Sequence, residues 1–151
     1  MRRRSLVLSL ASSLLVAAAA TADEAAAPSA PLGTLTVVPV GLEENRGSVM
    51  IKLASSQADF DSEETSFRSA TVKVENKSAV RVFEDLPHGE YAVKIFQDEN
   101  ENQKLDTNFV GIPKEKFGFS NNVIHRFGPS SYEESLFRFD AEEATIEIEM
   151  R

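Results

Sequence analysis

The chain has 151 residues, with 16 Lys and Arg against 24 Asp and Glu, a formal net charge of −8, and no Cys. Because nucleic acids and anionic membrane surfaces attract surfaces rich in Lys and Arg, this acidic balance argues against both as partners. The absence of Cys excludes disulfides, and a chain of this length can bury enough surface to fold as one domain without them.

The first 22 residues have the features of a secretory signal peptide. Arg2, Arg3 and Arg4 form a basic start, residues 6–20 are largely apolar, and residues 20–22 supply the small-x-small pattern of a cleavage site. The apolar run is too short and too rich in Ala and Ser for a membrane span, which needs about 20 strongly apolar residues. We therefore expect secretion to the periplasm or beyond, with no transmembrane segment in the mature chain.

The remainder divides into a leader and one domain. Residues 23–33 are dominated by Ala and Pro, which indicates a disordered leader before a folded domain at residues 34–151. From Thr34 onward apolar and polar residues alternate, the period-two pattern of half-buried β-strands. The expected strands lie near residues 35–40, 48–53, 71–75, 80–82, 91–95, 136–139 and 145–150. Strands of this number and length are typical of an all-β sandwich.

Turn residues refine this prediction. Residues 44–47 and 75–78 have turn-forming sequences, and we expect each to close a hairpin between the strands on either side. Helical periodicity is weak throughout, and one short turn of helix is expected within residues 57–68.

Residues 82–93 resemble the strand-corner-strand signature of the prealbumin-like sandwiches, which include transthyretin-like domains and stalk modules of bacterial adhesins. In that pattern Leu86 and Pro87 round a corner, with the Leu side chain plugging the end of the core. Gly89 allows the turn, and Tyr91 enters the next strand on its inner face. The resemblance implies a single Greek-key β-sandwich, prealbumin-like or immunoglobulin-like, with one long ordered loop.

That loop begins with oxygen-bearing side chains at every second position, a spacing that lets a tight turn surround Ca²⁺. The expected ligands are Asp98, Asn100, Asn102, Lys104 through its backbone carbonyl, and Asp106. Glu99, Glu101 or Asn108 could complete the shell.

An EF-hand as such is excluded. Gln103 stands where its loop needs Gly, Phe109 stands where it needs a bidentate Glu, and the flanking periodicity is β. The alternative to a calcium loop is an Asx-rich turn whose side chains bond to their own backbone amides.

Residues 98–129 also resemble a bacterial family of small secreted proteins catalogued as domain of unknown function 2141. The shared motifs are an acidic Asn-containing loop, Lys-Leu-Asp-Thr-Asn, Gly-x-Pro, aromatic-Gly-Phe-Ser-Asn-Asn and Phe-Gly-Pro, found here at residues 98–102, 104–108, 111–113, 117–122 and 127–129. Glu101 and Gln103 stand where glycines are common in the family pattern, and Gln97 where His is common. The resemblance implies a secreted or periplasmic single-domain protein, and it brings no activity.

The stretch from residue 109 to 132 is long for a connection, and such loops are usually functional or disordered. Its apolar residues lead us to expect that it packs onto the sandwich. It is then either a structural flap over one end of the core or a pocket or edge for a protein, peptide or saccharide. In the second case the contacting residues are expected to be Phe117, Phe119, Asn121, Asn122, His125 and Arg126.

No catalytic pattern is present: the chain lacks Cys, HExxH, a P-loop and Gly-x-Ser-x-Gly. We therefore expect a non-catalytic binding or interaction module that presents residues 98–132, with Ca²⁺ as the one cofactor that the pattern supports. The alternatives are a purely structural envelope protein without a ligand and, third, a hydrolase that pairs Ser120 with His125.

Overall fold

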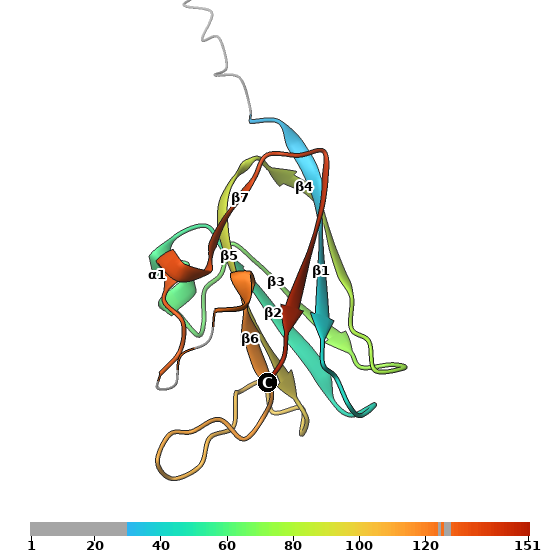
Figure 1. Ribbon diagram of the computed structural model, residues 1–151, viewed down its shortest axis with the longest axis vertical. Coiled ribbons are helices and arrows are strands. Elements are labelled where there is room, and N and C mark those ends of the chain that lie inside the picture. The colour runs from blue at the N-terminus through green and yellow to red at the C-terminus, as the bar shows by residue number, and fades with distance from the viewer. Residues whose placement is uncertain (1–29, 124, 126–127) are drawn as a thin grey trace, which may run out of the picture.

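A computed structural model describes residues 30–123, 125 and 128–151 and shows two β-sheets packed face to face (Figure 1). The smaller sheet has the order β4-β1-β8, formed by Arg81–Pro87, Leu32–Val40 and Glu143–Glu149. The larger sheet has the order β3-β2-β5-β6, formed by Arg68–Lys73, Ser48–Ala54, Gly89–Asp98 and Phe117–Phe119, and β7 (Leu136–Phe139) also pairs with β5. The predicted all-β sandwich is confirmed.

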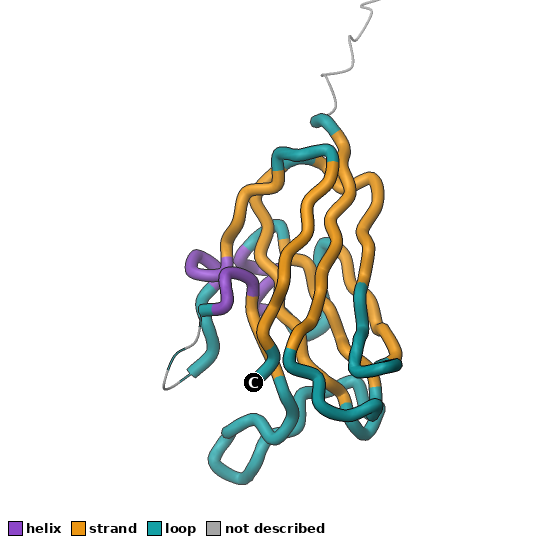
Figure 2. Tube along the Cα trace, turned by 45° about the vertical axis from the view of Figure 1, so that its right-hand side comes forward, coloured by secondary structure: helices purple, strands orange, loops and turns teal. Residues whose placement is uncertain are grey.

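Three short helical elements accompany the sheets: α1, Gln57–Asp61; the 3₁₀ turn η1, Ser120–Asn122; and α2, Tyr132–Ser135. Helices α1 and α2 lie together beside the larger sheet, while the loop after β5 projects beyond the ends of the strands (Figure 2). None of the helices among the described residues has the length and apolar character that a membrane crossing requires.

The core follows from the alternation seen in the sequence. Along β1 every second residue is buried, with Leu35 and Val37 fully enclosed between the sheets. Leu86 is also fully buried, and Tyr91 joins the same cluster while its hydroxyl donates to the Pro87 carbonyl at 2.8 Å. The predicted corner, with Leu as the plug and Tyr on the inner face, is therefore confirmed.

Strand β1 begins at Leu32, two residues before the predicted start of the domain, because Leu32 pairs with Pro87 and Gly33 with Leu86. The end of the expected leader thus belongs to the sheet. The predicted signal peptide at residues 1–22 and the leader residues 23–29 lie outside the described residues.

Both predicted hairpins are wrong, because β1 does not pair with β2 and β3 does not pair with β4. Strand β1 pairs with β4 and, in parallel, with β8, whereas β2 pairs with β3 and β5. The connections at residues 41–47 and 74–80 therefore cross between the sheets. The turn at 75–78 does form, since Glu75 and Ser78 exchange backbone hydrogen bonds and the two residues between them have left-handed φ. A turn sequence reverses the chain locally, but burial of each strand's apolar face decides which sheet it joins.

The stretch 109–132, predicted as one long loop packed on the sandwich, is divided. Residues 117–122 of this stretch contain β6, which pairs antiparallel with β5, and the turn η1. Residues 109–112 do not pack: Phe109 is 99% exposed and Ile112 is 60% exposed.

Candidate functional site

A groove of about 830 Å³ lies on the outer face of the larger sheet, away from the core. Its floor comes from β2, β5 and β6, where residues with outward side chains alternate with buried ones. One wall is the α1 segment, and the opposite wall is formed by residues within 105–116. His125, residues 128–130 and the C-terminal Arg151 complete the rim.

Cross-strand pairing arranges the floor in two rows. Lys94 on β5 stands between Lys52 on β2 and Phe119 on β6. In the next row Phe96 pairs with Phe117, and both rings are partly exposed. Because paired residues on one face of a sheet have Cβ atoms about 5 Å apart, the rings form a continuous apolar strip beside a pair of ammonium groups.

The two lysines hold the end of α1. Ser56 caps this helix by accepting a hydrogen bond from the Asp59 amide. Lys94 Nζ donates to the carbonyl of Phe60, within the helix, at 2.6 Å, and Lys52 Nζ donates to the carbonyl of Glu63, which follows the helix.

The pKa of the Lys52 ammonium group is lowered from its ordinary value. Burial lowers the pKa of Lys52, the Glu63 carboxylate raises it, and the neighbouring Lys94 lowers it. Positive charge is therefore concentrated on one side of the floor.

The opposite wall is an ordered turn. Asn108 Oδ1 accepts hydrogen bonds from the amides of Val110 and Ile112, each at 3.0 Å. Thr107 and Pro113 form an isolated antiparallel bridge below that turn. Gly111 has a φ of +82°, a left-handed value that glycine adopts without strain.

The base of this wall is the loop predicted to bind calcium. Asp98 is only 2% exposed, and its carboxylate accepts from the amides of Asn102 at 3.0 Å and Gln103 at 2.7 Å. The Asp106 carboxylate accepts from the side-chain amides of Asn100 at 2.7 Å and Asn102 at 3.0 Å. The loop is thus closed by its own acidic groups.

The structure brings the five predicted calcium ligands into one loop, with the amide of Lys104 donating to Asn102 Oδ1 at 2.8 Å. Their hydrogen bonds are those of the alternative interpretation, an Asx-rich turn. Over residues 30–123, 125 and 128–151, no three His, Cys, Asp or Glu side chains are grouped as metal ligands would be. Because amide and backbone oxygens also bind Ca²⁺, calcium binding stays a prediction.

Two residues of this loop have a backbone that glycine would adopt more easily. Glu101 has a φ of +60° and Gln103 a φ of +64°, at the two positions where the resemblance led us to expect Gly. In this chain the Glu101 carboxylate forms a salt bridge with Lys73 of β3, which ties the loop to the sheet.

A second buried carboxylate, which sequence reasoning missed, joins the two ends of the loop. Glu115 is 6% exposed and accepts from the amides of Glu99 at 2.9 Å and Asp106 at 2.8 Å. Its neighbours in the sequence, Lys114 and Lys116, are both charged. No local pattern in the sequence marks Glu115 as buried.

The aromatic-Gly-Phe-Ser-Asn-Asn run connects three elements. The Asn121 side-chain amide donates to the carbonyls of residues 134 and 136 at 3.0 and 2.9 Å. Asn122 Oδ1 accepts from the Glu149 amide at 2.8 Å. Both Asn residues have left-handed φ values, of +63° and +54°, which Asn tolerates better than most residues. Their amides thus join η1 to α2, β7 and β8.

Of the six predicted contact residues, Phe117, Phe119 and His125 line the groove, while Asn121 and Asn122 do not. Arg126 lies outside the described residues. Several groove residues were missed: Lys52, Phe60, Lys94, Phe96 and Ile112. The sequence offered one weak indication, for the two lysines alone: each is a charged residue in the middle of a largely apolar strand.

His125 bonds to Glu134 on α2. The Glu134 carboxylate accepts from the Ser131 amide and from His125 Nε2, both at 2.9 Å. The Ser131 hydrogen bond and then the His125 bond lower the pKa of Glu134 to about 2. Because this folded-state pKa is below the ordinary 4.5, the bonds stabilise α2 above about pH 4.5 and are lost as the pH falls through about 2.

We expect a ¹³C titration of the Glu134 side-chain carboxyl to have its midpoint near pH 2. In His125→Ala the midpoint should rise, but only part of the way to 4.5, because the Ser131 amide still donates. A midpoint near 4.5 in the unaltered protein would show that the capping box is open in solution.

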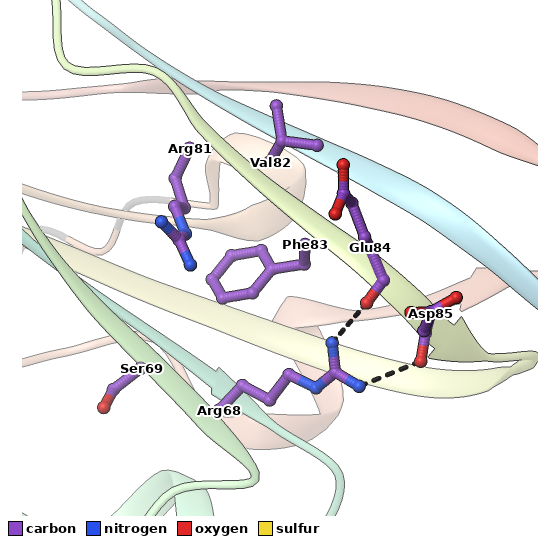
Figure 3. Close-up of a pocket in the computed structure, with 7 residues that line it drawn as sticks. All are labelled: Arg68, Ser69, Arg81, Val82, Phe83, Glu84 and Asp85. Atoms are coloured by element: carbon purple, nitrogen blue, oxygen red, sulfur yellow. Dashed lines mark hydrogen bonds between the residues drawn. The ribbon is translucent and has the colours of Figure 1, made fainter.

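A shallower hollow of about 500 Å³ lies between the edge strands β3 and β4 (Figure 3). Arg68 reaches across it and donates to the carbonyls of Glu84 at 2.5 Å and Asp85 at 2.9 Å. Arg81 stacks on Phe83, with the guanidinium carbon 5.5 Å from the ring centroid. Because the Arg68 guanidinium bonds to the β4 backbone, we interpret this hollow as a bridge between the sheets and the groove as the better ligand site.

One family model, described as an uncharacterized protein conserved in bacteria (domain of unknown function 2141), matches residues 37–147. Neither a curated protein nor a solved structure was found to match the chain.

Proposed function

Since the chain belongs to this bacterial family, whose description names no activity, we propose that it is an exported, non-catalytic binding module. Its ligand occupies the groove on the outer face of the larger sheet and has an apolar body and an acidic end. The N-terminal pattern of a basic start, an apolar run and a cleavage site supports export.

The observation that carries this proposal is the partly exposed strip of Phe96 and Phe117 at the bottom of the groove. A volume of about 830 Å³ lies within the range of small-molecule sites, about 300–1,000 Å³. Loop residues Leu105, Ile112 and Pro113 extend the apolar lining on one wall. An elongated apolar body would therefore be enclosed on three sides.

The charge of the lining supports an acidic end. Among the described residues, the groove is lined by five basic side chains and three acidic ones, although the whole chain has a net charge of −8. One of the three, Glu115, already accepts two backbone amides. The basic side chains are Lys52, Lys94, Lys114, Lys116 and Arg151.

Calcium binding at the Asp98 loop would act on the same site. This loop forms the base of the groove wall, so an ion there would stiffen the wall without touching the ligand. The competing interpretation is a structural protein without a ligand, and it predicts that the groove binds nothing specifically.

We expect 1-anilinonaphthalene-8-sulfonate, which has an aromatic body and an acidic group, to bind the folded protein saturably. Phe96→Ala should weaken binding roughly tenfold, because removal of the ring loses about 1.5 kcal/mol of apolar contact. Fluorescence titration measures both affinities.

The matched control is Phe67→Ala, since Phe67 is 40% exposed and does not line the groove. Its affinity for the dye should stay within about twofold of the unaltered protein. Dodecanoate should displace the dye more strongly than dodecanol does. Absence of saturable binding, or an equal loss in both variants, would favour the structural interpretation.

A further inference from the structure

The tip of the groove wall, residues 107–113, displays apolar side chains to solvent. Phe109 is 99% exposed, Val110 is 62% exposed and Ile112 is 60% exposed, and all seven residues of the tip are uncharged. At these exposures the three side chains do not bury one another, so the tip is not a small core of its own. Exposed apolar patches of this kind mark interaction sites.

The display is built into the backbone. Asn108 holds the turn through the amides of Val110 and Ile112, and the Thr107–Pro113 bridge closes it. Below the bridge the Lys114 amide donates to the Asp106 carbonyl at 2.8 Å. The tip is therefore ordered before any partner arrives, which reduces the entropy lost on docking.

We infer that this tip docks on a phospholipid bilayer, with Phe109, Val110 and Ile112 entering the acyl-chain boundary. A protein partner would need a pocket shaped to three side chains that scarcely touch one another, whereas fluid acyl chains accommodate them in any arrangement. Burial of such side chains is favourable in either medium, at about 25 cal/mol per Å² of apolar surface.

Two lysines near the tip suit phosphate head groups, and the acidic residue next to the tip, Asp106, already accepts hydrogen bonds from the side-chain amides of Asn100 and Asn102. Lys104 and Lys114 lie on either side of the uncharged stretch, and both side chains are exposed. Within the described part of the chain, neither takes part in a salt bridge. Lysines beside an inserted apolar segment keep their ammonium groups at the level of the head groups.

Part of the negative charge of the chain lies far from the tip, and in the loop at the base of the tip Glu99 and Glu101 form salt bridges with Arg46 and Lys73. The connection between β7 and β8, which carries Asp140, Glu142 and Glu143, lies at the end of the sandwich opposite the tip (Figure 1). A protein that approaches tip first keeps these carboxylates away from lipid phosphates.

The tip is also continuous with the groove, since Gly111, Ile112 and Pro113 line both. A molecule with an apolar body could thus pass between a bilayer and the groove without crossing bulk water. This last step rests on the proposed function of the groove, whereas docking of the tip does not.

A fluorescent label at the tip tests the inference. Because the chain has no Cys, Val110→Cys gives one site for a polarity-sensitive nitrobenzoxadiazole label. On vesicles of phosphatidylcholine with phosphatidylglycerol we expect its emission to shift to the blue and to be quenched by bromine-labelled acyl chains. The matched control is the same label at Val82→Cys on β4, where the valine is 42% exposed and belongs to the smaller sheet, and its emission should not change.

A further variant, Phe109→Asp, should lower vesicle affinity at least about tenfold, because a ring that would insert into the bilayer is replaced by a charge. Since Phe109 is 99% exposed and does not line the groove, this variant should fold and bind the groove dye with unchanged affinity. If the unaltered protein did not bind the dye, the proposed function of the groove would be contradicted, but the inference that the tip docks on a bilayer would not.

Three outcomes would overturn the inference. These are an unchanged emission at position 110, an equal shift at position 82, or full vesicle affinity in Phe109→Asp. A blue shift without vesicles that rises with protein concentration would assign the tip to a second copy of the chain instead.

Discussion

Replacing Asp98 by Ala is expected to lower the free energy of unfolding by about 3 kcal/mol. The Asp98 carboxylate is 2% exposed and accepts two backbone amides, from Asn102 and Gln103. Hydrogen bonds to a charged group are each worth about 1.5–3 kcal/mol, and the turn can recover part of this by admitting water. Urea unfolding in the presence of EDTA measures the change.

The matched control is Asp106→Ala in the same loop. The Asp106 carboxylate accepts from side-chain amides of two exposed residues, Asn100 and Asn102, so its removal should cost less than about 1 kcal/mol. Equal losses in the two variants would contradict the role of Asp98 as the centre of the turn.

Repeating the comparison with Ca²⁺ separates the two interpretations of the loop. Saturation at about 100 times the dissociation constant would add about 2.7 kcal/mol to the unaltered protein. Both variants should then lose that addition, because both aspartates are predicted ligands. Identical unfolding curves in EDTA and in millimolar Ca²⁺ would remove the calcium prediction and leave the Asx-rich turn.

Ser120→Ala is expected to destabilise the protein by about 2 kcal/mol. On one side of β5 the partner strand changes along its length. Residues 89–92 of β5 pair with β7, and residues 94–96 pair with β6. At this junction Ser120 Oγ accepts from the Val93 amide at 2.8 Å and donates to the Ser135 carbonyl. Alanine would leave a fully buried amide without this partner, and such groups cost about 1–3 kcal/mol each.

The control for this substitution is Ser69→Ala, because Ser69 is exposed on β3. Its effect should stay within about 0.5 kcal/mol. Chemical denaturation of the two variants side by side gives the difference. If Ser120→Ala were as mild as the control, Ser120 would not be completing the hydrogen bonds of β5.

All the strands except β6 were predicted from the period-two alternation, because alternation reflects the burial of one face of a strand whatever its partners are. Strand β6 lies within the stretch that was predicted as a loop. The predicted corner at Leu86 and Tyr91 was confirmed for the same reason: each side chain's burial follows from its position next to a turn. The hairpin pairings failed, since β1 and β2 lie in different sheets although a turn sequence connects them. A turn constrains about four residues, whereas pairing depends on every strand of the sandwich.

The candidate site was predicted in part. Residues 98–122 were recognised as important, and Phe117 and Phe119 line the groove. The other side of the groove comes from Lys52, Phe60 and Lys94, which no local pattern connects to that stretch. They meet it only because β2, β5 and β6 are neighbours in one sheet.

From the sequence alone, the all-β character, the family and the Asp98 loop could be established, because alternation and motif spacing are properties of short segments. Tertiary structure decided what the motifs do. Asn121 and Asn122 join elements of the fold, the Phe96 and Phe117 rings form a groove floor, and Phe109 is left in solvent. The physical reason is that exposure and contact depend on residues far apart in the chain, which only the packed sheets bring together.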